Sequence, residues 1–297
     1  MQSLVDKDII GPSKEATKDM TNSLVRSSEI YDSARRGNSA LEELRGVFQY
    51  RDLIFQLVRR DIVARYKRSV LGVAWTMLQP LGMMVVMTLV FSRLFHQVEG
   101  YPAYVLSGLI SWTFFSQTTT ASIQQMVWGG ALLNRIYLPR TSFSISAIGT
   151  GLVNLAISVI PLVVIVLVLR LPLTFSFLFV PISMLLLASF ALGVGLLLST
   201  LAVNFPDVSE MYQIILMAWM YFTPVIYPES MIPPEYQRWM FTLNPMYHLV
   251  KLFRAPIYEG KLPDLQSLLL GTVISLTTLI VGWIVFSRAA DRFAYKA

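Results

Sequence analysis

The sequence predicts an all-α membrane protein. We expect six transmembrane helices, an interfacial amphipathic helix before them, and short re-entrant helices in the outer loop between spans five and six. Hydrophobic residues make up 55% of the 297 positions, and charged residues make up only 14%, against about 25% in an ordinary soluble domain. Six long runs also lack any charged residue. Helices are expected because a backbone in lipid must satisfy its own hydrogen bonds, and these runs do not alternate as barrel strands do.

The charge-free runs give the expected spans, because a spanning helix needs about 20 mainly apolar residues. They cover residues 69–92, 100–134, 141–169, 171–206, 211–228 and 265–287. The chain then divides into a polar cytoplasmic tail (1–45), the amphipathic segment (46–68), the six-span domain (69–290) and a cytoplasmic C-terminus (291–297). The fifth run is the shortest. Either apolar and neutral residues just before Asp207 complete this span, or its helix tilts little in the membrane.

Lysine and arginine set the orientation, because cytoplasmic loops carry an excess of them. With the N-terminus inside, 18 of the 24 basic residues lie inside as well. The exceptions are Arg93, Arg170, Arg238, Lys251, Arg254 and Lys261. The net charge of +6 therefore follows from membrane topology, and no nucleic-acid partner is expected.

The segment "RDLIFQLVRRDIVARYKR" (51–68) is too polar to span. Its apolar residues form one stripe at helical spacing, made of Leu53, Ile54, Leu57, Val58 and Ile62. We expect the helix to lie along the inner membrane face with this stripe toward lipid. The basic residues would then meet anionic headgroups; they are Arg59, Arg60, Arg65, Lys67 and Arg68. An ordinary positive flank explains the charges but not the stripe.

Asp61 and Arg65 lie four residues apart with the acid first, which favours an ion pair between them on a helix.

Polar and small residues mark several of the spans. The second span carries many hydroxyls and amides between Ser107 and Gln125, which either bond across helices or face water in a pathway. Gly193 and Gly195 either let helices approach closely or simply face lipid.

The fifth run ends in "MAWMYFTPVIYP", where Pro224 should kink or end the helix. Its aromatic rings could stack on sugars, although core packing or interface anchoring explains each ring equally well. In the outer loop, Asn244 before Pro245 reads as a helix cap followed by proline at the first helical position.

Absent motifs narrow the function. The sequence has no G-x-x-x-x-G-K-[ST] loop, so the chain should not bind ATP by itself. No carboxylate interrupts the six runs, although carriers driven by proton or sodium gradients usually keep one in the membrane. There is no cysteine, and no metal site is expected. A separate protein that supplies energy could act on the inner loop "NRIYLPR" (134–140). The charges of this loop are equally explained by the rule that basic residues anchor cytoplasmic loops.

Several motifs in order resemble one family. They are "RRDIVARYKRSVLGVAWTMLQPL" (59–81), "NRIYLPR" (134–140), "FPDVSEMYQIIL" (205–216), "MYFTPVIYP" (220–228) and "LNPMYHLVKLFR" (243–254). Together they resemble the ABC-2 type permeases that export polysaccharides, over about residues 45–297.

The resemblance implies a homodimer of six-span chains in a bacterial inner (plasma) membrane, with both termini cytoplasmic. It implies two copies of a separate cytoplasmic ABC ATPase subunit that hold ATP and Mg²⁺, while this chain holds no cofactor and no catalytic residue. The cargo would be a polyprenyl diphosphate-linked glycan, such as O-antigen, teichoic acid or a capsule polymer. The alternatives are a drug or another lipid as cargo, or a membrane-embedded glycan transferase, which would need an acid or base at the membrane surface.

The resemblance also implies residue roles. The coupling helix that docks on the ATPase would contain Asn134, Arg135, Tyr137, Pro139 and Arg140. A channel between two protomers would be lined by the first and fifth spans, with candidates Trp75, Gln79, Trp219, Tyr221, Phe222 and Tyr227.

Overall fold

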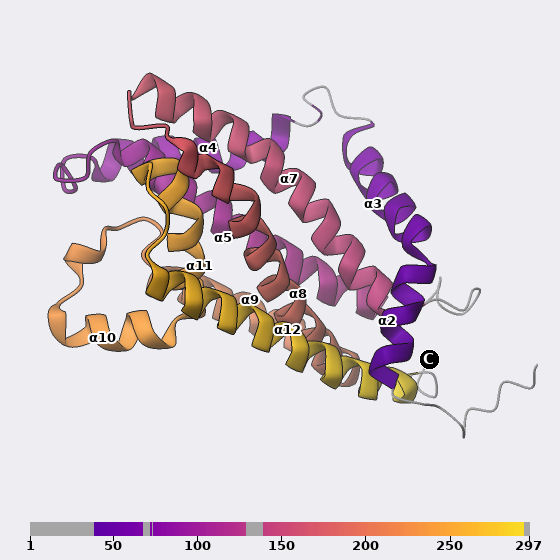
Figure 1. Cartoon of the computed structure of the whole chain (residues 1–297). Coiled ribbons are helices and arrows are strands. Elements are labelled where there is room, and N and C mark those ends of the chain that lie inside the picture. Colours follow the sequence, from indigo (N-terminus) through magenta and orange to yellow (C-terminus); the bar gives the residue numbers. More distant parts are fainter. Residues whose placement is uncertain (1–38, 68–71, 73, 129–138, 294–297) are drawn as a thin grey trace, which may run out of the picture. The chain divides into compact units, whose positions relative to one another are not determined.

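The computed structural model describes residues 39–67, 72, 74–128 and 139–293, and these residues form helices and no strands. The all-α prediction is therefore confirmed for this part of the chain. The helices, shown in Figure 1, are α2 (Ser39–Gln49), α3 (Arg51–Tyr66), α4 (Ala74–Phe91), α5 (Tyr101–Trp128), α7 (Thr141–Val168), η2 (Phe175–Phe179), α8 (Val180–Asn204), α9 (Val208–Phe222), η3 (Glu229–Met231), α10 (Pro234–Leu243), α11 (Pro245–Arg254), the π-helical turn η4 (Ala255–Glu259) and α12 (Leu265–Phe293).

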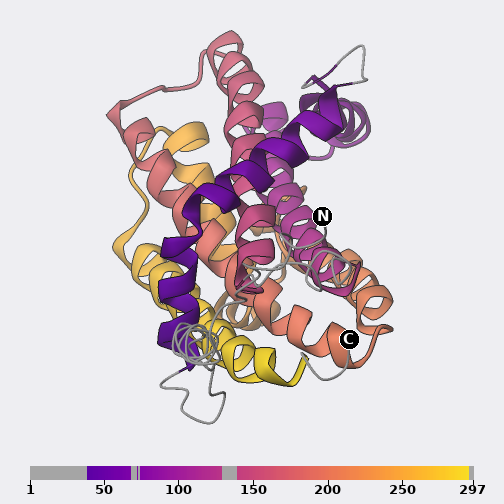
Figure 2. The same ribbon diagram turned by 90° about the vertical axis from the view of Figure 1, so that its right-hand side faces the viewer.

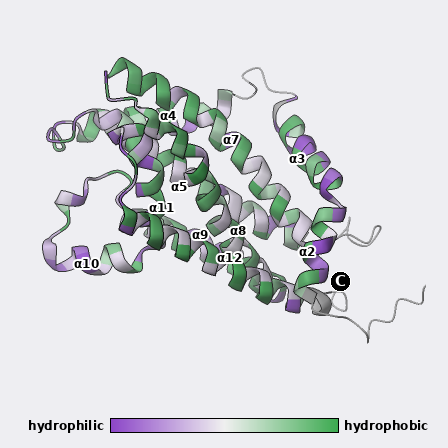
Figure 3. Cartoon of the chain, viewed as in Figure 1, coloured by the Kyte–Doolittle hydropathy of each residue, from purple (hydrophilic) through white to green (hydrophobic). Residues whose placement is uncertain are grey.

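Four of the described helices are long and apolar enough to cross a bilayer. They cover Ala74–Phe91, Thr141–Val168, Phe175–Asn204 and Leu265–Ala289. Figure 3 shows apolar residues along these helices, while polar residues gather on α3 and α10. Helix α5 has 28 residues, but its hydroxyls and amides dilute its hydropathy. Helix α9 has 15 residues and is therefore about 22 Å long, shorter than the hydrocarbon core.

In the described part of the chain, two helices precede the first span, where the sequence predicted one. The first of them, α2, begins at Ser39, inside the segment that the sequence assigned to the polar tail. Both α2 and α3 cross one end of the bundle (Figure 2), opposite the end that carries α10 and α11 (Figure 1).

Part of the apolar stripe of α3 packs on α7, so the expectation that the whole stripe faces lipid is wrong at Leu57 and Val58, and the position of the helix along the membrane face stays a prediction. Leu57 is buried, and Val58 lies so close to Gly149 that an added Cβ would come within 2.9 Å of its methyl group. Small residues near the start of α7 give the stripe a protein surface to cover. Phe55 and Val63 are exposed instead.

Glycine brings α8 and α12 into backbone contact. A Cβ on Gly193 would lie 2.5 Å from the main chain of Thr278, and one on Gly282 would collide with the carbonyl of Gly193. Gly195 faces α5, where an added Cβ would lie 3.0 Å from the hydroxyl of Ser122. Of the two interpretations of these glycines, close helix approach is the one confirmed.

The chain leaves helical structure after α9, next to Pro224, as predicted, and side chains then satisfy the exposed backbone. Arg254 donates to the carbonyls of Pro224 and Val225 at 3.1 to 3.2 Å. Tyr101 donates to the Ile226 carbonyl and Tyr104 to the Tyr227 carbonyl, both at 3.0 Å. Buried carbonyls need such partners when no helix supplies them.

Arg254 is the centre of this arrangement. Its side chain is 4% exposed, and its guanidinium lies 3.7 Å from the centroid of the Tyr104 ring. No carboxylate lies within ion-pair distance of it among the described residues. Gly108 makes room for it, because a Cβ there would lie 2.6 Å from the guanidinium. The sequence had suggested an ordinary charge in an outer loop.

Asn244 caps α11, as predicted. Its side-chain oxygen accepts from the amide of Met246 at 3.1 Å, and Pro245 is the first helical residue. The same oxygen accepts from the indole of Trp219 at 2.9 Å, and the amide nitrogen donates to the Phe222 carbonyl at 3.0 Å. One residue therefore starts α11 and ties it to the end of α9.

We predict that Arg254→Met destabilises the fold strongly. The substitution leaves the buried carbonyl of Val225 without a donor and the carbonyl of Pro224 with only a 3.4 Å hydrogen bond from Tyr104, and each hydrogen bond to a charged group contributes about 1.5–3 kcal/mol. Thermal unfolding of the detergent-solubilised protein measures the loss. The matched control is Arg238→Met on exposed α10, and equal melting temperatures for the two variants would contradict the role given to Arg254.

Alanine substitutions at two glycines should have opposite signs. Gly193→Ala forces a methyl group against the α12 backbone and should cost about 1–3 kcal/mol. Gly82→Ala on α4 meets nothing within 4 Å and should stabilise its helix by about 0.5–1 kcal/mol. The same unfolding assay distinguishes the two, and a stabilising Gly193→Ala would refute the close contact.

Candidate functional site

A groove of about 1170 Å³ runs between α3, α4, α5, α7 and α9. Its walls are rich in amides and hydroxyls although the helices around it are apolar. The polar residues that line it include Gln79 on α4, Thr113, Ser116, Gln117, Thr120, Gln124 and Gln125 on α5, Thr150, Asn154 and Ser158 on α7, and Gln213 on α9.

The polar residues on the two sides of helix α5 have different surroundings. Residues on one side are buried and bond within the bundle: Ser122 donates to Ser144 at 2.7 Å, and Thr119 shares a 2.7 Å hydrogen bond with Tyr212. Residues on the other side line the groove. Each face of the helix therefore carries one of the two expected roles.

A polar stripe on α7 forms one wall, and sequence reasoning missed it. Thr150, Asn154 and Ser158 recur every four residues and all line the groove. The hydroxyl of Thr150 is buried and has no hydrogen-bond partner in the described part of the chain. The four-residue spacing is visible in the sequence, within a run that is otherwise mainly apolar.

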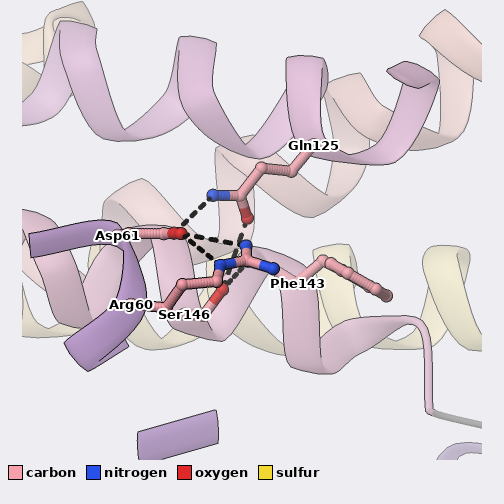
Figure 4. Close-up of polar contacts among 5 residues, drawn as sticks. All are labelled: Arg60, Asp61, Gln125, Phe143 and Ser146. Carbon is pink, nitrogen blue, oxygen red and sulfur yellow. Dashed lines mark hydrogen bonds and ion pairs between the residues drawn. The ribbon is translucent and has the colours of Figure 1, made fainter. Parts of the chain in front are cut away.

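The mouth of the groove carries charge (Figure 4). The guanidinium of Arg60 donates to Asp61 at 2.9 and 3.1 Å, and Gln125 donates to the other oxygen of Asp61 at 3.2 Å. Ser146 of α7 donates to the side-chain oxygen of Gln125 at 3.3 Å. The predicted pair of Asp61 with Arg65 does not form, because Asp61 turns toward the amide that α5 offers.

The predicted headgroup residues separate into groups. Arg60 and Arg65 line the groove. Arg59 and Lys67 are exposed and do not line it. Arg68 lies outside the described residues.

The predicted channel residues separate as well. Trp75 and Gln79 line the groove, and Gln79 accepts from Gln117 at 3.5 Å. Trp219 packs in the core, with its ring 5.3 Å from Phe115.

The remaining aromatic candidates lie near the end of α9. Tyr221 and Phe222 are exposed, and the hydroxyl of Tyr227 donates to the Tyr221 carbonyl at 2.7 Å. None of these three, nor Trp219, lines the groove.

The predicted coupling segment is described only at its end. Asn134, Arg135 and Tyr137 lie outside the described residues. Pro139 is buried against Gly46 of α2, and Thr141 donates to Glu43 of α2 at 2.8 Å. Burial lowers the pKa of Arg140, and the charge of Glu43 acts in the opposite direction.

Helix α2 also contacts the end of α12, where the indole of Trp283 donates to the Ala40 carbonyl at 3.0 Å. Helix α2 therefore contacts both the start of α7 and the end of α12, which are far apart in the sequence. No group of three metal-binding side chains occurs in the described ranges.

A polar groove inside an apolar helical bundle is the architecture of a membrane permease. The ABC-2 type transporter family matches residues 52–258, and the chain belongs to this family.

Curated relatives agree. The chain is 30% identical to the O-antigen export system permease protein RfbA of Myxococcus xanthus, over 84% of this chain and 97% of the relative. It is 26% identical to the RfbA permease of Klebsiella pneumoniae (82% and 94%). It is 24% identical to the polysialic acid transport protein KpsM of Escherichia coli (76% and 89%).

Single-cysteine variants should report whether the groove contains water, since the natural chain has no cysteine. We predict that Gln117→Cys and Asn154→Cys react with a charged thiol reagent about tenfold faster than Leu89→Cys, because the reactive thiolate forms in water. Leu89 is 77% exposed on α4 but faces the apolar surroundings of a span. Labelling rates in inside-out vesicles measure the difference. Equal rates at all three positions would mean that the groove is filled or faces lipid.

Proposed function

We propose that this chain is the membrane-spanning subunit of an ATP-binding cassette exporter. It moves a lipid-linked polysaccharide, such as O-antigen or a related cell-surface glycan, across the bacterial inner membrane. The observation that carries the proposal is the groove, whose amides and hydroxyls sit within an apolar bundle. A glycan leaving water loses hydrogen bonds, and such a wall can replace them. The relatives are named as export or transport proteins for O-antigen and polysialic acid, which supports the same cargo class.

Six spans complete the proposed topology. Helices α5 and α9 would be the second and fifth spans, with both termini cytoplasmic and α10 and α11 in the outer half. In support, α2 and α3 lie at one end of the bundle and α10 at the other (Figure 1). The outer short helices would then be re-entrant, and the side chains that satisfy the carbonyls of residues 222–227 would let irregular backbone exist there.

Motive force would come from two copies of an ATPase subunit on the inner face, which hold ATP and Mg²⁺. Membership of the ABC-2 family and the missing nucleotide loop support this partner. Residues Asn134, Arg135, Tyr137, Pro139 and Arg140 would form the coupling helix. The contacts of Pro139 and Thr141 with α2 would pass its movement to α12 as well as to α7.

A second copy would complete the route. Tyr221 and Phe222 are exposed on the same helix that closes one edge of the groove, so a partner could use them together with Trp75 and Gln79. Trp219 and Tyr227 would support these rings from behind. Arg59, Lys67 and Arg68 would anchor α3 to anionic lipid, while Arg60 and Arg65 face the cargo.

Two variants should fail in different ways. Gln79→Ala with Gln117→Ala should lower surface glycan by about tenfold, since two lost hydrogen bonds are worth about 1.4 kcal/mol or more, while the ATPase still co-purifies. Arg135→Glu should instead reduce recovery of the ATPase subunit. Glycan gels and affinity purification measure the two effects.

Gln97→Ala in the exposed outer turn is the control for both variants, and it should change neither readout. Normal surface glycan in the double variant would exclude the groove from the route. Full recovery of the ATPase with Arg135→Glu would exclude the coupling role.

A further inference from the structure

We propose that Gln125 and Asp61 position the guanidinium of Arg60, so that Arg60 and Arg65 form a binding site for a prenyl diphosphate at the mouth of the groove. The inference rests on the proposed function and deepens it. It names the two cations that meet the cargo, and it gives the uncharged Gln125 on another helix a defined role.

The Arg60–Asp61 contact needs an outside cause. Neighbouring residues on a helix point in different directions and do not ordinarily face each other. Here Arg60 bends back so that its Nε and Nη2 atoms lie 3.1 and 2.9 Å from one oxygen of Asp61. The carboxylate holds this position because Gln125 of α5 donates to its other oxygen at 3.2 Å.

Gln125 is itself fixed in orientation (Figure 4). Its amide nitrogen must face the carboxylate, because the amide oxygen would repel it. The single hydroxyl hydrogen of Ser146 is shared between the side-chain oxygen of Gln125 at 3.3 Å and the Phe143 carbonyl at 2.8 Å. Ser146 is 1% exposed, so the chain of contacts is anchored in the packed first turns of α7.

The free side of the guanidinium defines the ligand. Asp61 occupies the edge formed by Nε and Nη2, which leaves the Nη1 hydrogens and one Nη2 hydrogen for a phosphate, a ligand that arginine binds with two parallel hydrogen bonds. Arg65 also lines the groove, and no carboxylate in the described structure lies within ion-pair distance of it.

Charge fits the same ligand. Two arginines and one aspartate leave one uncompensated positive charge at the mouth, and a diphosphate ester is an anion with several phosphate oxygens. The neighbouring wall offers Trp75 and amides to the sugar that follows the diphosphate. A bare pair of arginines would be less selective, because without Asp61 the side chain of Arg60 would be free to turn toward any anionic headgroup.

A double-mutant cycle tests the positioning role in the whole complex with its ATPase, reconstituted in lipid nanodiscs. Farnesyl diphosphate is the probe, and inorganic diphosphate is the comparison. Arg60→Gln should weaken probe binding by at least about tenfold, as expected for a hydrogen bond to a charged group. Gln125→Leu should weaken it by about threefold to tenfold alone and by nothing further in the Arg60→Gln background, because contacting residues are not additive.

Gln56→Leu is the matched control. Gln56 is exposed on α3 and does not line the groove, so its loss should leave the affinity within about twofold of wild type. Asp61→Asn should behave like Gln125→Leu. Unfolding temperatures of all variants separate a positioning effect from a damaged fold.

The outcomes are distinguishable. Equal losses from Gln125→Leu in both backgrounds would overturn the positioning role while leaving glycan export, measured in parallel, as proposed. Inorganic diphosphate binding as tightly as the probe would overturn the lipid assignment in favour of a free anion. Failure of the wild-type complex to export glycan would overturn the proposed function itself.

Discussion

The buried guanidinium of Arg254 holds together the end of the bundle where α9 and α11 meet α5. The chain leaves helical structure around Pro224 in apolar surroundings, where an unsatisfied carbonyl is expensive. Arg254 donates to two of these carbonyls, and its flat face lies on Tyr104. Tyr101, Tyr104 and Asn244 satisfy the neighbouring carbonyls. Polar side chains thus replace a missing helical turn, and α5, α9 and α11 are joined as a result.

Arginine has a different role at the opposite end. Arg254 is 4% exposed and its donors meet carbonyls and a hydroxyl inside the protein. Arg60 has a side chain that is 57% exposed and holds one carboxylate on one edge. The first arrangement leaves little donor capacity for a ligand, whereas the second leaves an oriented edge facing the groove. Burial and hydrogen-bond partners, rather than residue type, distinguish an arginine that stabilises the fold from one whose donors are available to a ligand.

Helix α5 connects the rigid and the open parts of the bundle. Gly195 of α8 packs closely against Ser122 on one of its faces, and the Gly193 and Gly282 contact extends that packing to α12. The other face lines the groove with Gln117 and Gln124. A polar span is tolerated because its side chains meet either protein or the groove. The groove therefore has one firmly packed wall.

Local patterns in the sequence determined the helical class, the helix end near Pro224, the Asn244 cap and the basic character of α3, because each depends on neighbouring residues or on composition. Spacing alone could not decide which surface the stripe of α3 covers, why Trp219 enters the core, or which group Asp61 meets. These outcomes depend on residues far away in the chain, such as Gly149, Phe115 and Gln125. Only tertiary structure brings such partners together, and so it alone decided that the polar faces of α5 and α7 share one groove.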